Sequence, residues 1–217
     1  KGEILGICGL SDSGIHELAE ALFAVREVSS GTVVLSNSNT VIQSPRQAMS
    51  LKIGYVPKDR DKQALMVNDT IENNVCLPAV ELIKGRLGFL NPREKRELTN
   101  KVIKEFNVKA NDGSQIIRGL SGGNRQKVNL GRWMIQDKEI LILDCPTRGV
   151  DIGVKAYIYN AMIEAKNKGI SMIVVSDELP ELIGMSDTIL IMKNGVIKKT
   201  VKRSSGFTEE SIIEVML

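Results

Sequence analysis

One segment near the start of the chain has the glycine spacing of a phosphate-binding loop. Residues 9–16 read GLSDSGIH, so Gly9 and Gly14 fit the pattern G-x-x-x-x-G-K-[ST]. In such a loop the backbone N–H groups and the N-terminus of the next helix hold the phosphates. Ile15, however, stands where the pattern requires lysine, and His16 stands where it requires the Mg²⁺-binding serine or threonine. The loop therefore keeps its backbone pattern and lacks two side chains that bind a nucleotide and its metal.

The other side chains of this loop leave two interpretations open. Ser11 and Ser13 can still donate hydrogen bonds, whereas Asp12 can place a negative charge beside a polyanion. Loss of a lysine contact of about 1.5–3 kcal/mol weakens phosphate binding by about tenfold to more than a hundredfold. The loop is either a glycine turn kept for folding or a site of weak residual nucleotide binding.

A second segment, Leu120-Ser121-Gly122-Gly123-Asn124, precedes a predicted helix. Its serine offers a hydroxyl, its two glycines let backbone N–H groups approach a ligand, and the helix directs its positive end to the same place. Such a segment can bind a phosphate. The simpler alternative is that Ser121 only caps the helix.

Composition limits the classes of protein. The chain has 217 residues, a net charge of +3, 42% hydrophobic and 4% aromatic residues, which is ordinary for a soluble globular protein and indicates neither nucleic-acid nor anionic-lipid binding. No apolar run approaches the roughly 20 residues of a membrane span, and no secretory leader is recognisable. Cys8, Cys76 and Cys145 lack metal-binding spacing, and His16 is the single histidine. We therefore expect reduced, packed thiols in a cytoplasmic protein.

The pattern of apolar residues predicts an α/β chain with a helical middle. Strands are expected at 3–8, 52–57, 139–144 and 171–176, and helices at 15–24, 154–168 and 209–216, with a short one from Pro45. Hairpins are expected at 32–42 and around Asn194-Gly195. Within the middle, helices are expected from Asn91 to about 106 and at 125–136.

These elements predict one domain with an inserted part. We expect a core of about 1–69 and 136–217 and a helical subdomain of about 70–135. Because the chain starts directly in a buried strand, we also expect it to be a fragment of a longer polypeptide.

The order of these segments resembles that of an ATP-binding cassette (ABC) nucleotide-binding domain. The resemblance rests on the glycine loop, on Leu120–Asn124, on the strand ending at Asp144 and on the sequence PTRGVD at 146–151. More narrowly, the chain resembles the C-terminal cassette of the tandem ATP-binding proteins of bacterial monosaccharide importers of the ribose, galactose and xylose type. The narrower resemblance rests on residues 2–6, 9, 17–18, 124, 126–128, 146–155, 176 and 178–181.

The resemblance implies a fold and the positions of further site residues. The expected fold is a P-loop NTPase of the ABC class, with a mainly parallel sheet core, a β-rich flank and an inserted helical subdomain. Lys58 stands at the Q-loop glutamine, Cys145 at the general-base glutamate and Asp177 at the switch histidine, while Asp144 keeps the Walker B acid.

These replacements predict a degenerate site within the chain. Asp144 is expected to hold Mg²⁺ at most weakly, through a bound water. The Cys145 thiol is a poor general base and is expected to be a packed side chain. Lys58 is expected to be a solvated surface lysine, with contact to a phosphate or to a transmembrane partner as the alternative. Asp177 is expected to repel a phosphate.

The motifs that face a partner, in contrast, are kept. By resemblance, the signature Leu120–Asn124 and the D-loop residues Gly149, Val150 and Asp151 act on ATP and Mg²⁺ held mainly by a second cassette, and Asp151 is expected to contact the partner's site. The expected partners are an upstream tandem cassette, transmembrane permease subunits that couple near Lys58 and, indirectly, a sugar-binding protein, without nucleic acid. The expected location is peripheral, on the cytoplasmic face of the inner membrane.

Four alternatives stay open. A nucleoside or autoinducer importer would use a similar cassette. A non-transport ABC protein of DNA repair or translation is another alternative; the repair class usually carries a long coiled coil between the two motifs, whereas Gly14 and Ser121 are about 107 residues apart. A binding module without any role in hydrolysis does not explain the intact signature. A functional ATPase with an unusual loop would hydrolyse ATP as an isolated chain, which we expect to show little or no activity.

Overall fold

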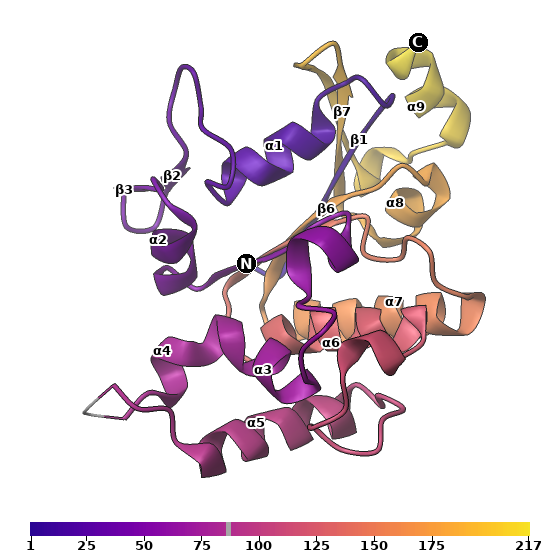
Figure 1. The fold of residues 1–217 in the computed structure, drawn as a ribbon. Helices are drawn as coiled ribbons and strands as arrows, with labels where there is room; N and C mark the ends of the chain where they lie inside the picture. The colour runs from indigo at the N-terminus through magenta and orange to yellow at the C-terminus, as the bar shows by residue number, and fades with distance from the viewer. Residues whose placement is uncertain (86–87) are drawn as a thin grey trace. The chain divides into compact units, whose positions relative to one another are not determined.

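The structure, a computed structural model, describes residues 1–85 and 88–217 in two compact units (Figure 1). The first, here called the α/β unit, consists of residues 1–58, 138–146 and 159–217; the second, here called the helical unit, consists of residues 59–137 and 147–158. Residues 86 and 87, which the expected helical subdomain includes, lie outside the described residues. The expected boundaries near 70 and 135 stay a prediction.

The α/β unit contains a six-stranded sheet with the strand order β4-β5-β6-β1-β7-β8. The strands are β1 (Ile4–Gly9), β4 (Ile53–Val56), β5 (Ile140–Asp144), β6 (Ser171–Val175), β7 (Thr188–Lys193) and β8 (Val196–Lys202). Neighbouring strands from β4 to β7 pair in parallel, and β8 pairs antiparallel with β7. The central strands are apolar without alternation because both faces of a parallel sheet are covered. The expected mainly parallel α/β sheet is confirmed.

Two hairpins lie where the turn residues predict them. Asn194 and Gly195 join β7 to β8 with φ angles of 52° and 73°, and two positive φ angles define the tight turn that Asn-Gly favours. Strands β2 (Val34–Leu35) and β3 (Thr40–Val41) form a separate two-stranded antiparallel sheet.

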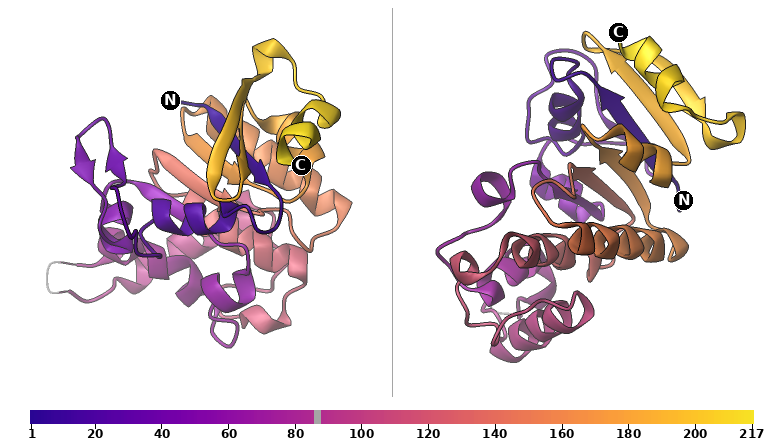
Figure 2. Two further views of the ribbon diagram at one scale, coloured as in Figure 1. Left: turned by 90° about the horizontal axis from the view of Figure 1, so that it is seen from above. Right: turned by 90° about the vertical axis from the view of Figure 1, so that its right-hand side faces the viewer.

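Helices cover both faces of the main sheet. Figures 1 and 2 show α1 (Ile15–Leu22) on one side and α8 (Leu179–Met185) and α9 (Glu209–Met216) on the other. Helix α2 (Pro45–Ser50), the short 3₁₀ turn η4 (Arg203–Ser205) and the part of α7 (Ile152–Asn167) that begins at residue 159 also belong to this unit. Helix α1 ends before the expected Ala24, because that residue has a φ angle of 57°, outside the helical range. Helix α8 was not expected from the sequence.

The helical unit holds the middle of the chain. Its elements among the described residues are η1 (Arg60–Ala64), α3 (Ile71–Cys76), η2 (Leu77–Ala79), α4 (Val80–Ile83), α5 (Pro92–Glu105), η3 (Ile117–Gly119), α6 (Gly122–Met134) and the first part of α7 (Ile152–Asn167). The side chain of Asn91 caps α5, as expected, by accepting a hydrogen bond from the Arg93 N–H at 3.0 Å. Helix α6 begins three residues earlier than expected, with both glycines inside its first turn.

Candidate functional site

The ends of four strands of the α/β unit carry the residues of the expected nucleotide site. Gly9 ends β1 and Asp144 ends β5, while Lys58 and Asp177 each follow the ends of β4 and β6 by two residues. These strands are parallel neighbours, so their carboxyl ends share one edge of the sheet. Open α/β sheets bind ligands at this edge.

The glycine loop has the backbone conformation that its spacing predicts. Gly14 precedes α1 with a φ angle of 86°, which favours glycine. A Cβ atom on Gly9 would lie only 2.2 Å from the Ser13 hydroxyl oxygen, so that position also requires glycine. Ser13 is buried, and its Oγ atom has no hydrogen-bond partner among the described residues. Ser11 and Asp12 are exposed at the tip of the loop.

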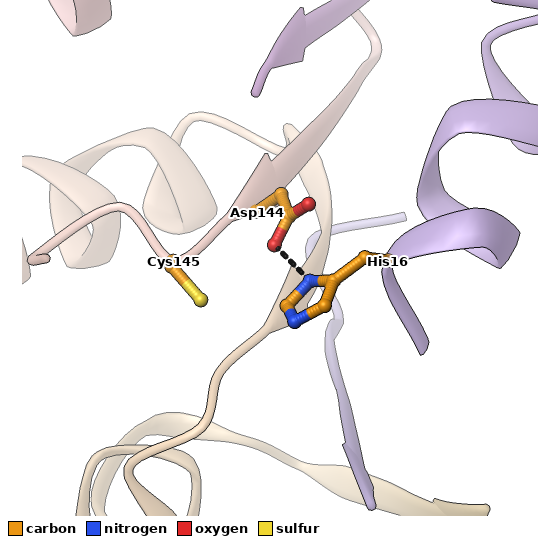
Figure 3. A group of neighbouring side chains, drawn as sticks. All are labelled: His16, Asp144 and Cys145. Carbon is orange, nitrogen blue, oxygen red and sulfur yellow. Dashed lines mark hydrogen bonds and ion pairs between the residues drawn. The ribbon is translucent and has the colours of Figure 1, made fainter. Parts of the chain in front are cut away.

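The two replaced positions of the loop lie in different environments. Ile15 is completely buried, with 0% of its surface exposed, so its side chain belongs to the core. His16, one residue further along α1, turns toward the end of β5 (Figure 3).

His16 is the centre of a polar cluster formed with Lys58, Asp144 and Asp177, here called the His16 cluster. The His16 Nδ1 atom lies 2.8 Å from Asp144 Oδ1, and its Nε2 atom lies 3.3 Å from Asp177 Oδ1. The Lys58 Nζ atom lies 2.9 Å from Asp177 Oδ2 and 2.6 Å from His16 Nε2. The expectation that Lys58 is a solvated surface lysine is therefore wrong, because its ammonium group is paired inside the cluster.

The groups of the cluster shift one another's pKa values. The hydrogen bond to Asp144 is the main reason why the pKa of His16 is raised; burial and the Lys58 charge act against it, and both carboxylates act with it. Burial raises the pKa of Asp177, but the contacts with Lys58 and His16 outweigh burial and leave it lowered. With His16 protonated, two cations face two carboxylates; the contact between Lys58 Nζ and His16 Nε2 is a hydrogen bond only when the imidazole is neutral.

Cys145 lies beside this cluster as a buried thiol. It follows β5 with a φ angle of 48°, and its Sγ atom lies 3.8 Å from Asp177 Oδ2, to which the thiol donates. Burial, helped by the charge of Asp144, raises the pKa of Cys145 to about 12. A thiol that holds its proton so strongly does not act as a general base near neutral pH.

The residues at this edge do not fit Mg²⁺ and a nucleoside triphosphate. The Asp144 oxygen nearest the loop is bound to His16, and the lysine position of the loop is buried as Ile15. His16, Asp144 and Cys145 place one nitrogen, one oxygen and one sulfur within 4.8 Å of one another. Mg²⁺ prefers six oxygen ligands, so this set does not match it.

The signature segment lies in the helical unit. Ser121 caps α6: its Oγ atom accepts hydrogen bonds from the backbone N–H of Asn124 at 3.4 Å and from the Asn124 amide at 2.9 Å. The side-chain oxygen Oδ1 of Asn124 in turn accepts a hydrogen bond from the Lys109 backbone N–H at 2.9 Å. Ser121 is exposed and Leu120 is buried beneath it. Because the hydroxyl accepts both bonds from Asn124, its own proton is available for a ligand.

The D-loop residues lie beside the signature in the same unit. Gly149 has a φ angle of 68°, and its carbonyl oxygen would lie 3.5 Å from a Cβ atom on Gly122. Exposed Asp151 caps the start of α7, where its Oδ1 atom accepts a hydrogen bond from the Val154 N–H at 2.9 Å. Val150 between them is partly exposed.

Arg60 was missed by the sequence analysis. Its Nη1 atom donates a hydrogen bond to the Arg148 carbonyl, one residue before the D-loop glycine, at 2.8 Å. The one feature of the sequence that could have pointed to Arg60 is its position two residues after Lys58, the Q-loop position.

The predicted site residues thus form two groups. The α/β unit holds the loop residues of 9–16 together with Lys58, Asp144, Cys145 and Asp177, and the helical unit holds residues 120–124 and 149–151. Among the residues that the structure describes, no helix is both long enough and apolar enough to cross a bilayer.

The fold and the order of the motifs define an ATP-binding domain of the ABC class. The sequence model of the family described as ABC transporter matches residues 1–148, and the chain belongs to this family. Similar curated proteins include ribose import ATP-binding protein RbsA of Halalkalibacterium halodurans, 39% identical over 212 residues, which cover 98% of this chain and 42% of that protein. RbsA of Caldanaerobacter subterraneus is 36% identical over 98% of this chain and 43% of its own length. The chain therefore spans about two fifths of the length of these relatives.

Solved structures show the same fold. A dimeric post-hydrolysis state of the ATP-binding cassette MJ0796, bound to ADP and Pi, matches with a TM-score of 0.79 at 21% identity, over 93% of this chain and 85% of that chain. A nucleotide-free cassette from an ABC transporter matches with a TM-score of 0.77 at 21% identity, over 100% of this chain and 88% of that one. The expected P-loop NTPase fold of the ABC class is confirmed.

Proposed function

We propose that the chain is the catalytically silent cassette of a sugar importer, in which it completes the active site of a partner cassette. The main support is the contact between His16 and Asp144, in which a residue of the glycine loop binds the acid that would otherwise orient Mg²⁺. In this proposal the glycine loop at residues 9–16, which is a degenerate Walker A loop, does not bind or hydrolyse ATP together with Lys58, Cys145 and Asp177.

The chain contributes to hydrolysis through its signature and its D-loop. The exposed Ser121 hydroxyl and the backbone N–H groups at the start of α6 would donate hydrogen bonds to a phosphate held by the partner cassette. Asp151 is exposed beside them and is the D-loop residue that we expect to approach the partner's site. ATP supplies the free energy for transport, and Mg²⁺ accompanies it in the partner's site.

The rest of the assembly follows from the relatives. Because the relatives are more than twice as long as the matched segment and are named for ribose import, we propose a tandem protein with a second, N-terminal cassette that powers import of a monosaccharide. Permease subunits and, indirectly, a sugar-binding protein complete the transporter. The cassette then lies peripherally on the cytoplasmic face of the membrane, with core segments of about 1–69 and 136–217 and a helical subdomain of about 70–135.

Two experiments test this proposal. The isolated chain is expected to show no measurable ATP hydrolysis and no thermal stabilisation by Mg²⁺ and ATP. Turnover that Asp144→Asn abolishes would contradict the silent site.

In the full-length protein assembled with its permease, Ser121→Arg is expected to abolish hydrolysis and transport while the other cassette still binds ATP. Normal transport by Ser121→Arg would refute the role of the signature.

A further inference from the structure

Arg60 contacts the backbone of two functional segments within the helical unit. Its Nη1 atom donates a hydrogen bond to the Arg148 carbonyl at 2.8 Å. Its Nη2 atom would lie 3.2 Å from a Cβ atom on Gly122 and 3.8 Å from one on Gly149. The guanidinium group therefore packs against the signature glycine and the D-loop glycine at once.

The arginine lies beside a neighbouring carboxylate, at the outer limit of an ion pair. Only 16% of its side chain is exposed, and its Nε atom lies 3.9 Å from Asp61 Oδ1. The other oxygen of Asp61 lies 2.9 Å from Nη1 of Arg125, whose backbone N–H bonds to the Ser121 carbonyl at 2.9 Å. Asp61 thus joins the arginine to the start of α6.

The geometry suits an arginine beside a glycine. A planar guanidinium can donate from one nitrogen to a carbonyl while its other nitrogen packs flat against a neighbouring backbone. The compact ammonium group of lysine cannot make both contacts. A side chain on Gly122 would meet the guanidinium at 3.2 Å, closer than ordinary van der Waals contact.

We propose that Arg60 is a positioning residue that fixes the D-loop against the signature, so that both meet the partner cassette as one surface. The proposal rests on the proposed function, in which these two segments act in the partner's site. Arg60 acts through the Arg148 carbonyl and Gly149, and does not itself touch the nucleotide.

Arg60→Met in the full-length protein, assembled with its permease in membranes, tests this role. Loss of a charge-assisted hydrogen bond to the D-loop backbone is expected to lower kcat for ATP hydrolysis about tenfold. KM for ATP is expected to stay unchanged, because the nucleotide is bound by the other cassette. Arg60→Lys is expected to restore part of kcat. The matched control is Lys62→Met in the same short helix, whose side chain is 84% exposed and which is expected to retain full activity.

A second measurement does not depend on hydrolysis. In the nucleotide-free protein, the backbone amides of residues 148–151 are expected to exchange hydrogen faster in Arg60→Met than in Lys62→Met. The amides of β4 in the α/β unit serve as the internal reference and are expected to exchange at equal rates in both variants. In an Asp151→Ala background, Arg60→Met is expected to add little further loss of kcat, because both changes act through the D-loop.

The outcomes separate this proposal from the proposed function. Wild-type kcat and wild-type exchange in Arg60→Met, with Ser121→Arg inactive, would overturn the positioning role alone. A raised KM with unchanged kcat would also overturn it, because that result indicates a direct contribution to nucleotide binding. Full activity of Ser121→Arg would instead overturn the proposed function. Global unfolding of both Arg60 variants, seen as loss of protection in β4, would show that Arg60 is a general stability residue and would contradict the proposal.

Discussion

The Nδ1 atom of His16 lies 2.8 Å from the Oδ1 atom of Asp144, which ends β5. The loop pattern has a Mg²⁺-binding serine or threonine at position 16, and the ABC pattern has its Walker B acid at position 144. Here the imidazole is the hydrogen-bond partner of the carboxylate. Lys58 and Asp177 extend the contact into a charge-balanced cluster, which explains how a buried acid is stable at this edge of the sheet.

Removing the acid is expected to destabilise the α/β unit. Asp144 is only 2% exposed, and Asp144→Asn leaves the two cations His16 and Lys58 with a single carboxylate. Loss of a charged hydrogen bond costs about 1.5–3 kcal/mol, so we expect the free energy of unfolding to fall by about 2 kcal/mol. Urea unfolding of the isolated chain at mildly acidic pH measures this change. A stability equal to that of wild type would show that the cluster contributes nothing.

Asp12→Asn is the matched control for this experiment. Asp12 lies in the same glycine loop but is exposed, so its replacement is expected to change the free energy of unfolding by less than about 0.5 kcal/mol.

The pKa of His16 is a direct measure of the same contact. Because Asp144 accepts its proton and Asp177 lies close by, the pKa is expected above the unperturbed value of 6.5, although burial and Lys58 oppose the shift. His16 is the single histidine of the chain, so one NMR titration reports it without ambiguity. In Asp144→Asn the pKa is expected to fall. A wild-type pKa at or below 6.5 would contradict the pairing.

The shift also fixes the sign of a pH effect on stability. A group whose pKa is higher in the folded state stabilises the fold fully below its unfolded pKa. The contribution of His16 is therefore complete below about pH 6.5 and is lost as the pH rises through the folded pKa. Urea titrations of wild type and His16→Gln are expected to converge as the pH rises above that value.

The sequence was sufficient to predict the parallel sheet and the glycine loop, because both depend on local patterns. Buried strands such as Ile140–Asp144 are continuous apolar runs, and the loop is defined by glycine spacing. The limits of α1 and α6 differ from the predicted ones. The positive φ angle of Ala24 has no signal in residue type, and two glycines inside the first turn of α6 oppose helix propensity.

The partners of the site residues could not be predicted in the same way. Lys58 and Asp177 are far apart in the chain, and the sequence around each one predicts only a charged side chain at the surface. Their pairing depends on the order of β4, β5 and β6 in the sheet, which residue patterns do not specify. The contact of Arg60 with Arg148 likewise joins two segments 88 residues apart.

The three cysteines are expected to be unreactive in the folded chain. Burial raises the pKa of Cys8 to about 11 and that of Cys145 to about 12, and it also raises the pKa of Cys76. At about pH 8 only about one in a thousand Cys8 side chains is a thiolate, the form that reacts. An aromatic disulfide reagent is expected to label the native chain slowly and all three thiols in urea. Rapid labelling of one native thiol would contradict the burial of that residue.

Gly123 of the signature is expected to tolerate no side chain, for a reason of packing. A Cβ atom there would lie 2.7 Å from Cγ2 of Val154, whose β-branched side chain in α7 has little rotamer freedom. Overpacking costs about 1–3 kcal/mol, which exceeds the gain of about 1 kcal/mol in helix propensity. Gly123→Ala is therefore expected to lower the free energy of unfolding by about 1 kcal/mol and to be rescued in part by Val154→Ala.

Gly184 provides the opposite case in α8. A Cβ atom there meets nothing within 4 Å, so Gly184→Ala is expected to stabilise the chain by about 0.5–1 kcal/mol. Urea unfolding of both alanine variants and of the Gly123→Ala/Val154→Ala double variant measures the difference. If the two single variants change stability equally, or if Val154→Ala gives no rescue, the close approach of the signature helix to α7 does not limit residue 123. A destabilised Gly123→Ala beside a stabilised Gly184→Ala would instead show that the glycine is required by this contact and not by helix formation alone.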